Sequence, residues 1–216
     1  MSPLPDDRAA RLDALLGRAP VLPVLVIEHP DDAVPLARTL VEAGLPVLEV
    51  TMRTGAALDA LRRIAAEVPA AIVGAGTVLD AATLDAVTGA GAVFAIAPGA
   101  TDGLYDAADA SPLPFLPGIA TAGELMRGLE RGHRRFKFFP AEAAGGIAAL
   151  RAFAGPFPQV RFCPTGGIGA HSAPAYLRLP NVLTVGGSWM VPAEALAARD
   201  WDRIGALARE CVALAG

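Results

Sequence analysis

The stretch "VLPVLVIEHPDDAVPLARTLVEAGLPVLEVTM", residues 21–52, decides the fold class. It begins and ends on short runs rich in valine and leucine, 21–27 and 46–52, with the length and composition of buried strands. Between them, apolar residues recur at helical spacing, acidic residues come first and Gly44 comes last, so the sequence predicts a helix over 31–44. A strand, a helix and a second strand in this order predict a βαβ unit of a parallel sheet.

The same alternation continues along the rest of the chain. Six further apolar runs have strand character: "AIVGAGTV" (71–78), "AVFAIAP" (92–98), "PFLPGI" (114–119), "RFKFFP" (135–140), "QVRFCPT" (159–165) and "NVLTVGGS" (181–188). Helices are predicted near 6–17, over 121–132 and near 199–214. The second of these begins with Thr121 and Glu124 at the spacing of a capping box. The chain therefore has eight predicted strands and an extra helix before the first one.

Eight parallel strands can close into a barrel or form an open, doubly wound sheet. The strands are spaced by about 20 to 25 residues, and no GxGxxG motif follows the first strand. Both observations favour a (β/α)8 TIM barrel, an α/β fold. The length of 216 residues suits one such domain, so we expect residues 1–216 to form a single barrel with an added N-terminal helix.

The composition excludes several classes of function. The formal net charge of −4 provides no basic surface for nucleic acid, and no stretch is long and apolar enough to cross a membrane. Two cysteines, Cys163 and Cys211, form neither a disulfide framework nor a metal motif. His29, His133 and His171 lack metal-ligand spacing, and we expect them at the surface or at helix caps. We expect a cytoplasmic protein without a metal.

Polar side chains within the apolar strands are the candidates for chemistry. Glu49, Thr51 and Arg53 share one face of their strand, and Lys137 and Phe139 share one face of theirs. Lys137 is the only lysine in the chain. Unlike an arginine, a lysine desolvated among aromatic rings can lose its proton and attack a carbonyl carbon. A purely structural ion pair of Glu49, with Lys137 or with Arg53, is an open alternative, and Arg53 could instead hold a carboxylate.

Glycine pairs follow the last two predicted strands, in "PTGGIG" (164–169) and "VGGSWM" (185–190). In TIM barrels the loops after the seventh and eighth strands commonly bind phosphate through backbone N–H groups. Small or rigid residues, Thr77 and Pro98, stand near the ends of other strands and leave space at the mouth. The sequence therefore predicts a phosphorylated substrate.

Six segments in this order resemble one enzyme family: "VLEVTMRT", "AIVGAGTV", "FAIAPG", "FKFFPAE", "FCPTGGI" and "VGGSWMVP". The chain resembles the bacterial 2-keto-3-deoxy-6-phosphogluconate (KDPG) aldolases from about residue 20 to residue 210. The resemblance implies a (β/α)8 barrel, usually a homotrimer, and a class I aldolase without metal or cofactor. Such an enzyme cleaves KDPG to pyruvate and glyceraldehyde 3-phosphate in the Entner–Doudoroff pathway, and also acts on 4-hydroxy-2-oxoglutarate.

The resemblance also implies roles for individual residues. Lys137 matches the Schiff-base lysine and Glu49 the general acid and base. The residues matching the substrate contacts are Arg53 and Thr77 for the pyruvyl carboxylate, Pro98 and Phe139 for the walls, Thr165 for the substrate chain, and Gly166, Gly167, Gly186, Gly187 and Ser188 for the phosphate. The chain departs from the enterobacterial pattern at Glu28 and His29, where basic residues would stand.

Three other functions are open at this point. An aldolase for the galactonate-derived epimer, or one that acts chiefly on the unphosphorylated 4-hydroxy-2-oxoglutarate, would use the same mechanism. A phosphosugar isomerase or epimerase would use Glu49 as a base without covalent chemistry. A binding module for pyridoxal phosphate or a phosphosugar would need a lysine and a phosphate cradle as well.

Overall fold

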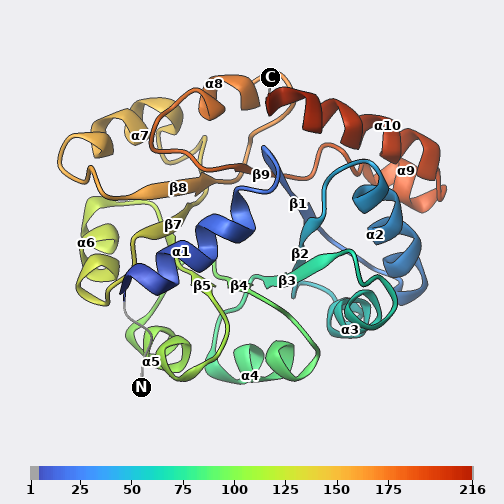
Figure 1. Cartoon of the computed structure of the whole chain (residues 1–216), viewed down its shortest axis with the longest axis horizontal. Helices are drawn as coiled ribbons and strands as arrows, with labels where there is room; N and C mark the ends of the chain where they lie inside the picture. The colour runs from blue at the N-terminus through green and yellow to red at the C-terminus, as the bar shows by residue number, and fades with distance from the viewer. Residues whose placement is uncertain (1–4, 216) are drawn as a thin grey trace.

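The computed structural model describes residues 5–215 as a ring of parallel strands surrounded by helices (Figure 1). The strands are β1 (Val21–Leu25), β2 (Val47–Thr51), β3 (Ile72–Gly76), β4 (Ala95–Ile96), β5 (Phe115–Leu116), β6 (Gly118–Ile119), β7 (Arg135–Phe138), β8 (Arg161–Pro164) and β9 (Val185–Gly187). They pair in the orders β5-β4-β3-β2-β1-β9 and β6-β7-β8.

The two sheets together close a barrel. β5 and β6 are separated only by Pro117, and a bridge between Thr165 and Gly186 joins the end of β8 to β9. All eight predicted strands are confirmed, although the regular pairing is shorter than the apolar runs, most of all in β4. The run over 114–119 is divided in two at Pro117, where the backbone nitrogen has no hydrogen to donate to a neighbouring strand.

The helices form the outer layer (Figure 1). They are α1 (Pro5–Leu16), α2 (Ala33–Glu42), α3 (Ala57–Glu67), α4 (Ala81–Gly89), α5 (Asp102–Ala110), α6 (Ala122–Glu130), α7 (Gly146–Ala154), α8 (Ala173–Leu177), α9 (Ala193–Ala197) and α10 (Trp201–Val212), with the 3-10 turns η1 (Pro30–Asp32) and η2 (Ala213–Ala215). The predicted helices are confirmed. The one over 31–44 begins as η1, and the capping box of Thr121 and Glu124 is formed at the start of α6.

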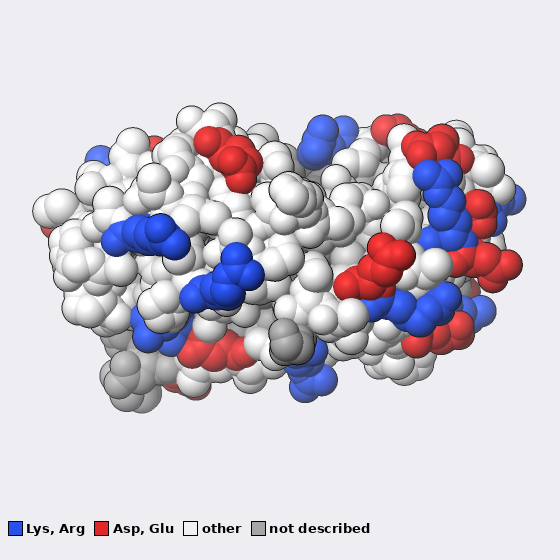
Figure 2. All heavy atoms as spheres, turned by 90° about the horizontal axis from the view of Figure 1, so that it is seen from above, with Lys and Arg blue, Asp and Glu red and all other residues white. Residues whose placement is uncertain are grey.

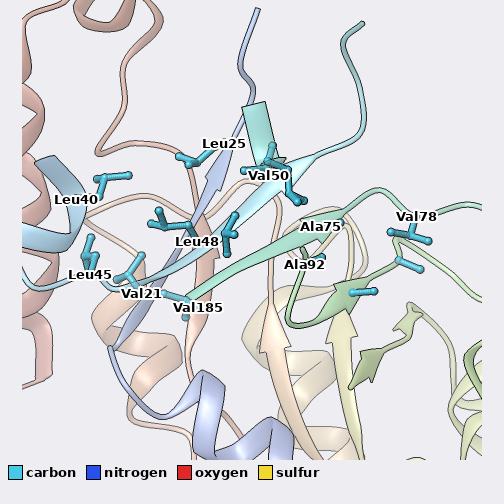
Figure 3. Close-up of a cluster of buried hydrophobic side chains, with 14 of the residues drawn as sticks. Val21, Leu25, Leu40, Leu45, Leu48, Val50, Ala75, Val78, Ala92 and Val185 are labelled. Carbon is cyan, nitrogen blue, oxygen red and sulfur yellow. The ribbon is translucent and has the colours of Figure 1, made fainter. Parts of the chain in front are cut away.

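Outward-facing side chains of the strands form the larger part of the core. Figure 3 shows Leu25 of β1 and Leu48 and Val50 of β2 in one cluster with Leu40 of α2 and Leu45 of the loop after it. All five are at most 1% exposed. Truncating one such leucine to alanine costs about 2 to 5 kcal/mol of stability. The helix layer is therefore held to the barrel by apolar burial on the side away from the strands' inner face.

A second, smaller cluster fills the inside of the barrel, and α1 covers it. Leu12 and Leu16 of α1 belong to this cluster together with inward-facing strand residues, among them Leu22, Phe94 and Cys163. In Figure 1, α1 crosses the ring of strands instead of joining the outer layer. Ion pairs from Arg8 to Asp109, at 2.7 Å, and from Arg135 to Asp13 fix the helix there. The amino-terminal end of the barrel is thus filled and covered, which leaves the opposite end for chemistry.

The surface is mixed in charge. Figure 2 shows acidic and basic side chains interleaved over one end of this face and separate charged side chains, set among uncharged ones, over the rest. No helix in the described part of the chain is long and apolar enough to span a membrane.

His133 is a correction to the sequence analysis, which placed it at the surface or at a helix cap. The side chain is 3% exposed and lies against the rings of Tyr105, Phe115 and Phe136. Gly132, at a φ of 83°, turns the chain back into the core after α6. The Nε2 atom of His133 has no hydrogen-bond partner among the described residues. Burial, assisted by the charge of Arg8, lowers the pKa of His133 to about 4.

This lowered pKa predicts a loss of stability in mild acid. Above pH 6.5 His133 is neutral in both states, but between about 6.5 and 4 the unfolded chain binds a proton that the folded chain rejects. As the pH is lowered from about 6.5 to about 4, the titration of His133 should therefore reduce the free energy of unfolding by up to roughly 3 kcal/mol. Denaturant titrations at several pH values measure this loss. The free energy of unfolding of His133→Phe should decrease less in acid than that of the native protein. The control His171→Asn, at an exposed position, should lose as much as the native protein. An equally steep fall in His133→Phe would contradict the assignment.

Candidate active site

A buried ion pair lies inside the barrel near its carboxyl-terminal end. Lys137 Nζ of β7 donates to Glu49 Oε1 of β2 at 2.8 Å. Glu49 is 0% exposed and Lys137 is 5% exposed. The strand register places both on the inner face, as the alternation of side chains in the sequence predicted. The two side chains therefore meet across the barrel from strands 88 residues apart.

Glycine makes the space for the Glu49 side chain. A Cβ atom at Gly76 of the neighbouring β3 would lie 2.1 Å from Glu49 Oε1, so no larger residue fits while the carboxylate keeps its place. The second carboxylate oxygen, Oε2, is buried and has no hydrogen-bond partner among the described residues. Because unpaired buried oxygens are rare and costly, Oε2 is an acceptor suited to a substrate hydroxyl or to water.

Apart from Glu49, the groups next to Lys137 are uncharged. Its Nζ lies 5.7 Å from the centre of the Phe139 ring, which is 36% exposed at the mouth. Cys163 pairs with Lys137 in the sheet register, and its Sγ lies 3.9 Å from Thr165 Oγ1. Burial raises the pKa of the Cys163 thiol to about 12, so the thiol is neutral. Glu49 is therefore the carboxylate available to exchange a proton with Lys137, and the thiol of Cys163 beside them is neutral.

The predicted carboxylate-binding residues lie at the mouth. Arg53 follows β2 and is exposed, and it forms no ion pair with any described residue. An ion pair of Glu49 with Arg53, one of the alternatives from the sequence, is therefore wrong, because Glu49 pairs with Lys137 instead. Thr77 follows β3 with a φ of 58°, which a residue with a Cβ rarely adopts. Such strain at a strand end is typical of ligand-binding positions.

The loop after β8 presents unused backbone donors. Gly166 and Gly167 have φ angles of 103° and 79°, conformations that favour glycine. Within the described residues, no hydrogen bond uses the N–H group of either glycine. Successive free backbone N–H groups in a turn can form an anion-binding concavity. The Gly166 and Gly167 N–H groups are thus the candidate phosphate cradle.

The remaining predicted residues complete the rim. Thr165 bridges to Gly186 of β9, and a Cβ atom at Gly186 would lie 2.3 Å from Thr165 Oγ1. Ser188 follows β9 and is exposed. Pro98 lies after β4, and its carbonyl group packs on Gly118. A Cβ atom at Gly118 would lie 2.2 Å from the Pro98 carbonyl oxygen. The structure therefore brings all the predicted residues to one end of the barrel.

A cavity of about 780 Å³ lies at the ends of β1 and β9, against α9, and neither Lys137 nor Glu49 is among its lining residues. Its lining includes Ser188, the predicted mouth residues Glu28 and His29, and two positions that the sequence analysis missed, Val24 and Trp189. Val24 pairs with Glu49 in the register of β1 and β2, so the alternation of side chains along β1 could have placed Val24 on the inner face. Trp189 had no such signal; its ring lies against Gly187, where a Cβ atom would be 1.8 Å from it.

No group of three or more potential metal ligands is found among the described residues. The chemistry that the geometry itself offers is an amine in hydrogen-bond contact with a carboxylate, an adjacent unpaired acceptor, and a nearby anion cradle. This set is suited to covalent chemistry on the carbonyl of an anionic substrate.

Comparisons with known proteins agree with this geometry. The family model described as KDPG and KHG aldolase matches residues 12–207. The KHG/KDPG aldolase of Escherichia coli (strain K12) is 57% identical over 200 residues, 93% of this chain and 94% of that protein.

Two solved structures are similar over most of their length. The KDPG aldolase of Legionella pneumophila, with pyruvate captured at low pH as a covalent carbinolamine intermediate, has a TM-score of 0.91 and 48% identity over 93% of this chain and 97% of that one. The 2-keto-3-deoxy-6-phosphogluconate aldolase of Zymomonas mobilis ZM4 with 3-phosphoglycerate has a TM-score of 0.90 and 52% identity over 94% of this chain and 95% of that one. The chain therefore belongs to the KDPG and KHG aldolase family.

Proposed function

We propose that the protein is a class I aldolase that cleaves KDPG to pyruvate and glyceraldehyde 3-phosphate through a Schiff base on Lys137. The observation that carries the proposal is the 2.8 Å contact between the only lysine of the chain and a fully buried glutamate. Family membership supports the same reaction, as does the carbinolamine captured in the Legionella pneumophila relative. The route needs no metal and no cofactor.

The first half of the reaction forms the Schiff base. Transfer of one proton from Lys137 Nζ to Glu49 Oε1 gives a neutral amine, which attacks the keto carbon C2 of the substrate. As the C–N bond forms, a proton moves from Nζ to the keto oxygen and gives a neutral carbinolamine. The protonated Glu49 carboxyl then gives its proton to the carbinolamine oxygen, which leaves as water. The product is an iminium that bonds Nζ to C2, with Glu49 again a carboxylate.

The second half breaks the carbon–carbon bond. Glu49 accepts the proton of the C4 hydroxyl, directly or through a water molecule, and Oε2 is its oxygen that has no hydrogen-bond partner among residues 5–215. The electrons of the C3–C4 bond move into the iminium, so the aldehyde leaves and an enamine remains. Protonation at C3 and hydrolysis by water then release pyruvate and restore the amine of Lys137.

The two ends of the substrate require two anion sites. We assign the pyruvyl carboxylate to Arg53 and Thr77, because Arg53 has no other ionic partner among the described residues and lies at the mouth. Pro98, Phe139 and Thr165 would line the chain between the ends. The phosphate would bind at Gly166, Gly167, Gly186, Gly187 and Ser188, on the two loops where TIM barrels commonly bind phosphate.

We propose that residues 1–216 act as one barrel domain, as a homotrimer in the cytoplasm. The same pyruvyl-binding residues would serve 4-hydroxy-2-oxoglutarate, which yields pyruvate and glyoxylate and has no phosphate to bind. A non-covalent isomerase would use Glu49 as the base but would give Lys137 no role that an arginine could not fill.

Replacing Lys137 tests the covalent step. Lys137→Arg keeps the positive charge but removes the nucleophile, so kcat/KM for KDPG should fall at least about a thousandfold. Pyruvate release can be measured with lactate dehydrogenase and NADH. The matched control Arg135→Lys, on the same strand but at the covered end of the barrel, should keep near-native kinetics. Activity of Lys137→Arg within tenfold of the native protein, with a native far-UV spectrum, would refute the Schiff base.

Replacing Glu49 tests the proton transfers. Glu49→Gln keeps the shape of the side chain but cannot take or give a proton, so kcat for KDPG should fall by about 10² to 10⁴. Loss of the carboxylate also leaves the Lys137 ammonium unpaired in the barrel, which should lower the free energy of unfolding by about 3 kcal/mol. Steady-state kinetics and a denaturant titration measure the two effects. An unchanged kcat would remove Glu49 from the mechanism.

A further inference from the structure

A hydrogen bond outside the catalytic pair connects two elements beside the phosphate cradle. Tyr176 Oη of α8 donates to Glu142 Oε1 at 2.7 Å, and Glu142 is the last residue of the segment "FKFFPAE". Tyr176 is 0% exposed, whereas Glu142 is exposed. Burial and the hydrogen bond to the Glu142 carboxylate both raise the pKa of Tyr176 well above its usual range. The tyrosine is therefore a fixed, protonated donor to a carboxylate that water could otherwise solvate.

The backbone of Ala141 and Glu142 determines where the cradle points. Ala141 N–H donates to the Thr165 carbonyl at 2.8 Å, and Glu142 N–H donates to the Gly166 carbonyl at 3.1 Å. In a trans peptide unit, the C=O group of one residue and the N–H group of the next point in opposite directions. Because the carbonyls of Thr165 and Gly166 are both held by this segment, the N–H groups of Gly166 and Gly167 are both directed away from it.

The Glu142 side chain adds a steric contact to these hydrogen bonds. A Cβ atom at Gly167 would lie 2.8 Å from both Cβ and Cγ of Glu142, so the methylene groups of Glu142 pack directly on the Gly167 backbone. Tyr176 Oη packs in a similar way on the turn that follows this segment. A Cβ atom at Gly146 would lie 3.0 Å from Tyr176 Oη. The side chains of Glu142 and Tyr176 thus fill the space between this turn and the cradle.

We propose that Glu142 and Tyr176 are positioning residues that set the direction of the Gly166 and Gly167 N–H groups and thereby the affinity for the phosphate of the substrate. The inference rests on the proposed function for the assignment of that phosphate to the cradle. Neither side chain is hydrogen bonded to Lys137 or Glu49. The pair therefore acts on binding of the phosphorylated end and leaves the chemistry at Lys137 unchanged.

The test separates phosphate binding from catalysis. Tyr176→Phe removes only the hydroxyl group, Glu142→Gln keeps the methylene groups and an acceptor oxygen, and Tyr105→Phe removes a hydroxyl from a buried tyrosine of α5 as a control. Steady-state kinetics are measured with KDPG and with 4-hydroxy-2-oxoglutarate, which has no phosphate. Two further readouts are the Kd of inorganic phosphate by calorimetry and the exchange of the pyruvate methyl protons in D2O.

The expected pattern is specific to the phosphate. In Tyr176→Phe, KM for KDPG and Kd for phosphate should rise about fivefold, since the lost hydrogen bond is to a charged group and part of its energy reaches the loop. The kcat values, KM for 4-hydroxy-2-oxoglutarate and methyl exchange should stay within twofold. Glu142→Gln and Tyr105→Phe should bind phosphate no more weakly than the native protein.

Two results would overturn the proposal. One is an unchanged Kd for phosphate in Tyr176→Phe; the other is an equal loss with both substrates, which would indicate general damage. Failure of the native protein to exchange the methyl protons would instead contradict the Schiff base at Lys137. The phosphate titration does not depend on that lysine and would still decide the roles of Glu142 and Tyr176.

Discussion

The ion pair between Lys137 and Glu49 is the constraint on which the rest of the barrel depends. Removing two charged groups from water costs several kcal/mol each, and a single contact of 2.8 Å with one unpaired oxygen recovers only part of that cost. Apolar side chains of similar volume would pack here at least as favourably. The pair is therefore explained by chemistry, and the surrounding structure accommodates it: glycine at position 76 leaves space for the carboxylate, and the nearby Cys163 thiol is neutral.

The fold separates the part of the barrel that provides stability from the part that provides chemistry. Side chains from α1 and from the strands fill the amino-terminal end of the barrel with an apolar cluster. This cluster keeps water away from the Lys137–Glu49 pair on that side. The other end consists of loops whose backbone is held in place, while donors such as the Gly166 and Gly167 N–H groups have no hydrogen-bond partner in the described part of the chain. A rigid frame with unpaired donors costs little reorganisation when an anion binds, which is the requirement for effective electrostatic catalysis.

Some features of the structure could be predicted from the sequence, and others could not. The eight strands and the Lys137–Glu49 pair were predictable, because alternation along a strand determines which face each side chain occupies and a barrel brings inner faces together. The buried position of His133 was not, because it depends on where Gly132 turns the chain after α6. Contacts such as that between Glu142 and Tyr176 join residues 34 positions apart through loops, and no periodicity encodes them. The family resemblance added substrate contacts, whose roles are proposals.

The measurement that tests the central claim most directly is a peptide map after treatment with pyruvate and borohydride. Lys137 is the only lysine, so a reduced Schiff base has one side chain on which to form. We expect one pyruvate-dependent adduct per chain, confined to the peptide that contains Lys137 and absent when pyruvate or borohydride is left out. A folded protein that gains no adduct, or gains one elsewhere, would contradict covalent catalysis by Lys137 and leave the pair with Glu49 a structural feature.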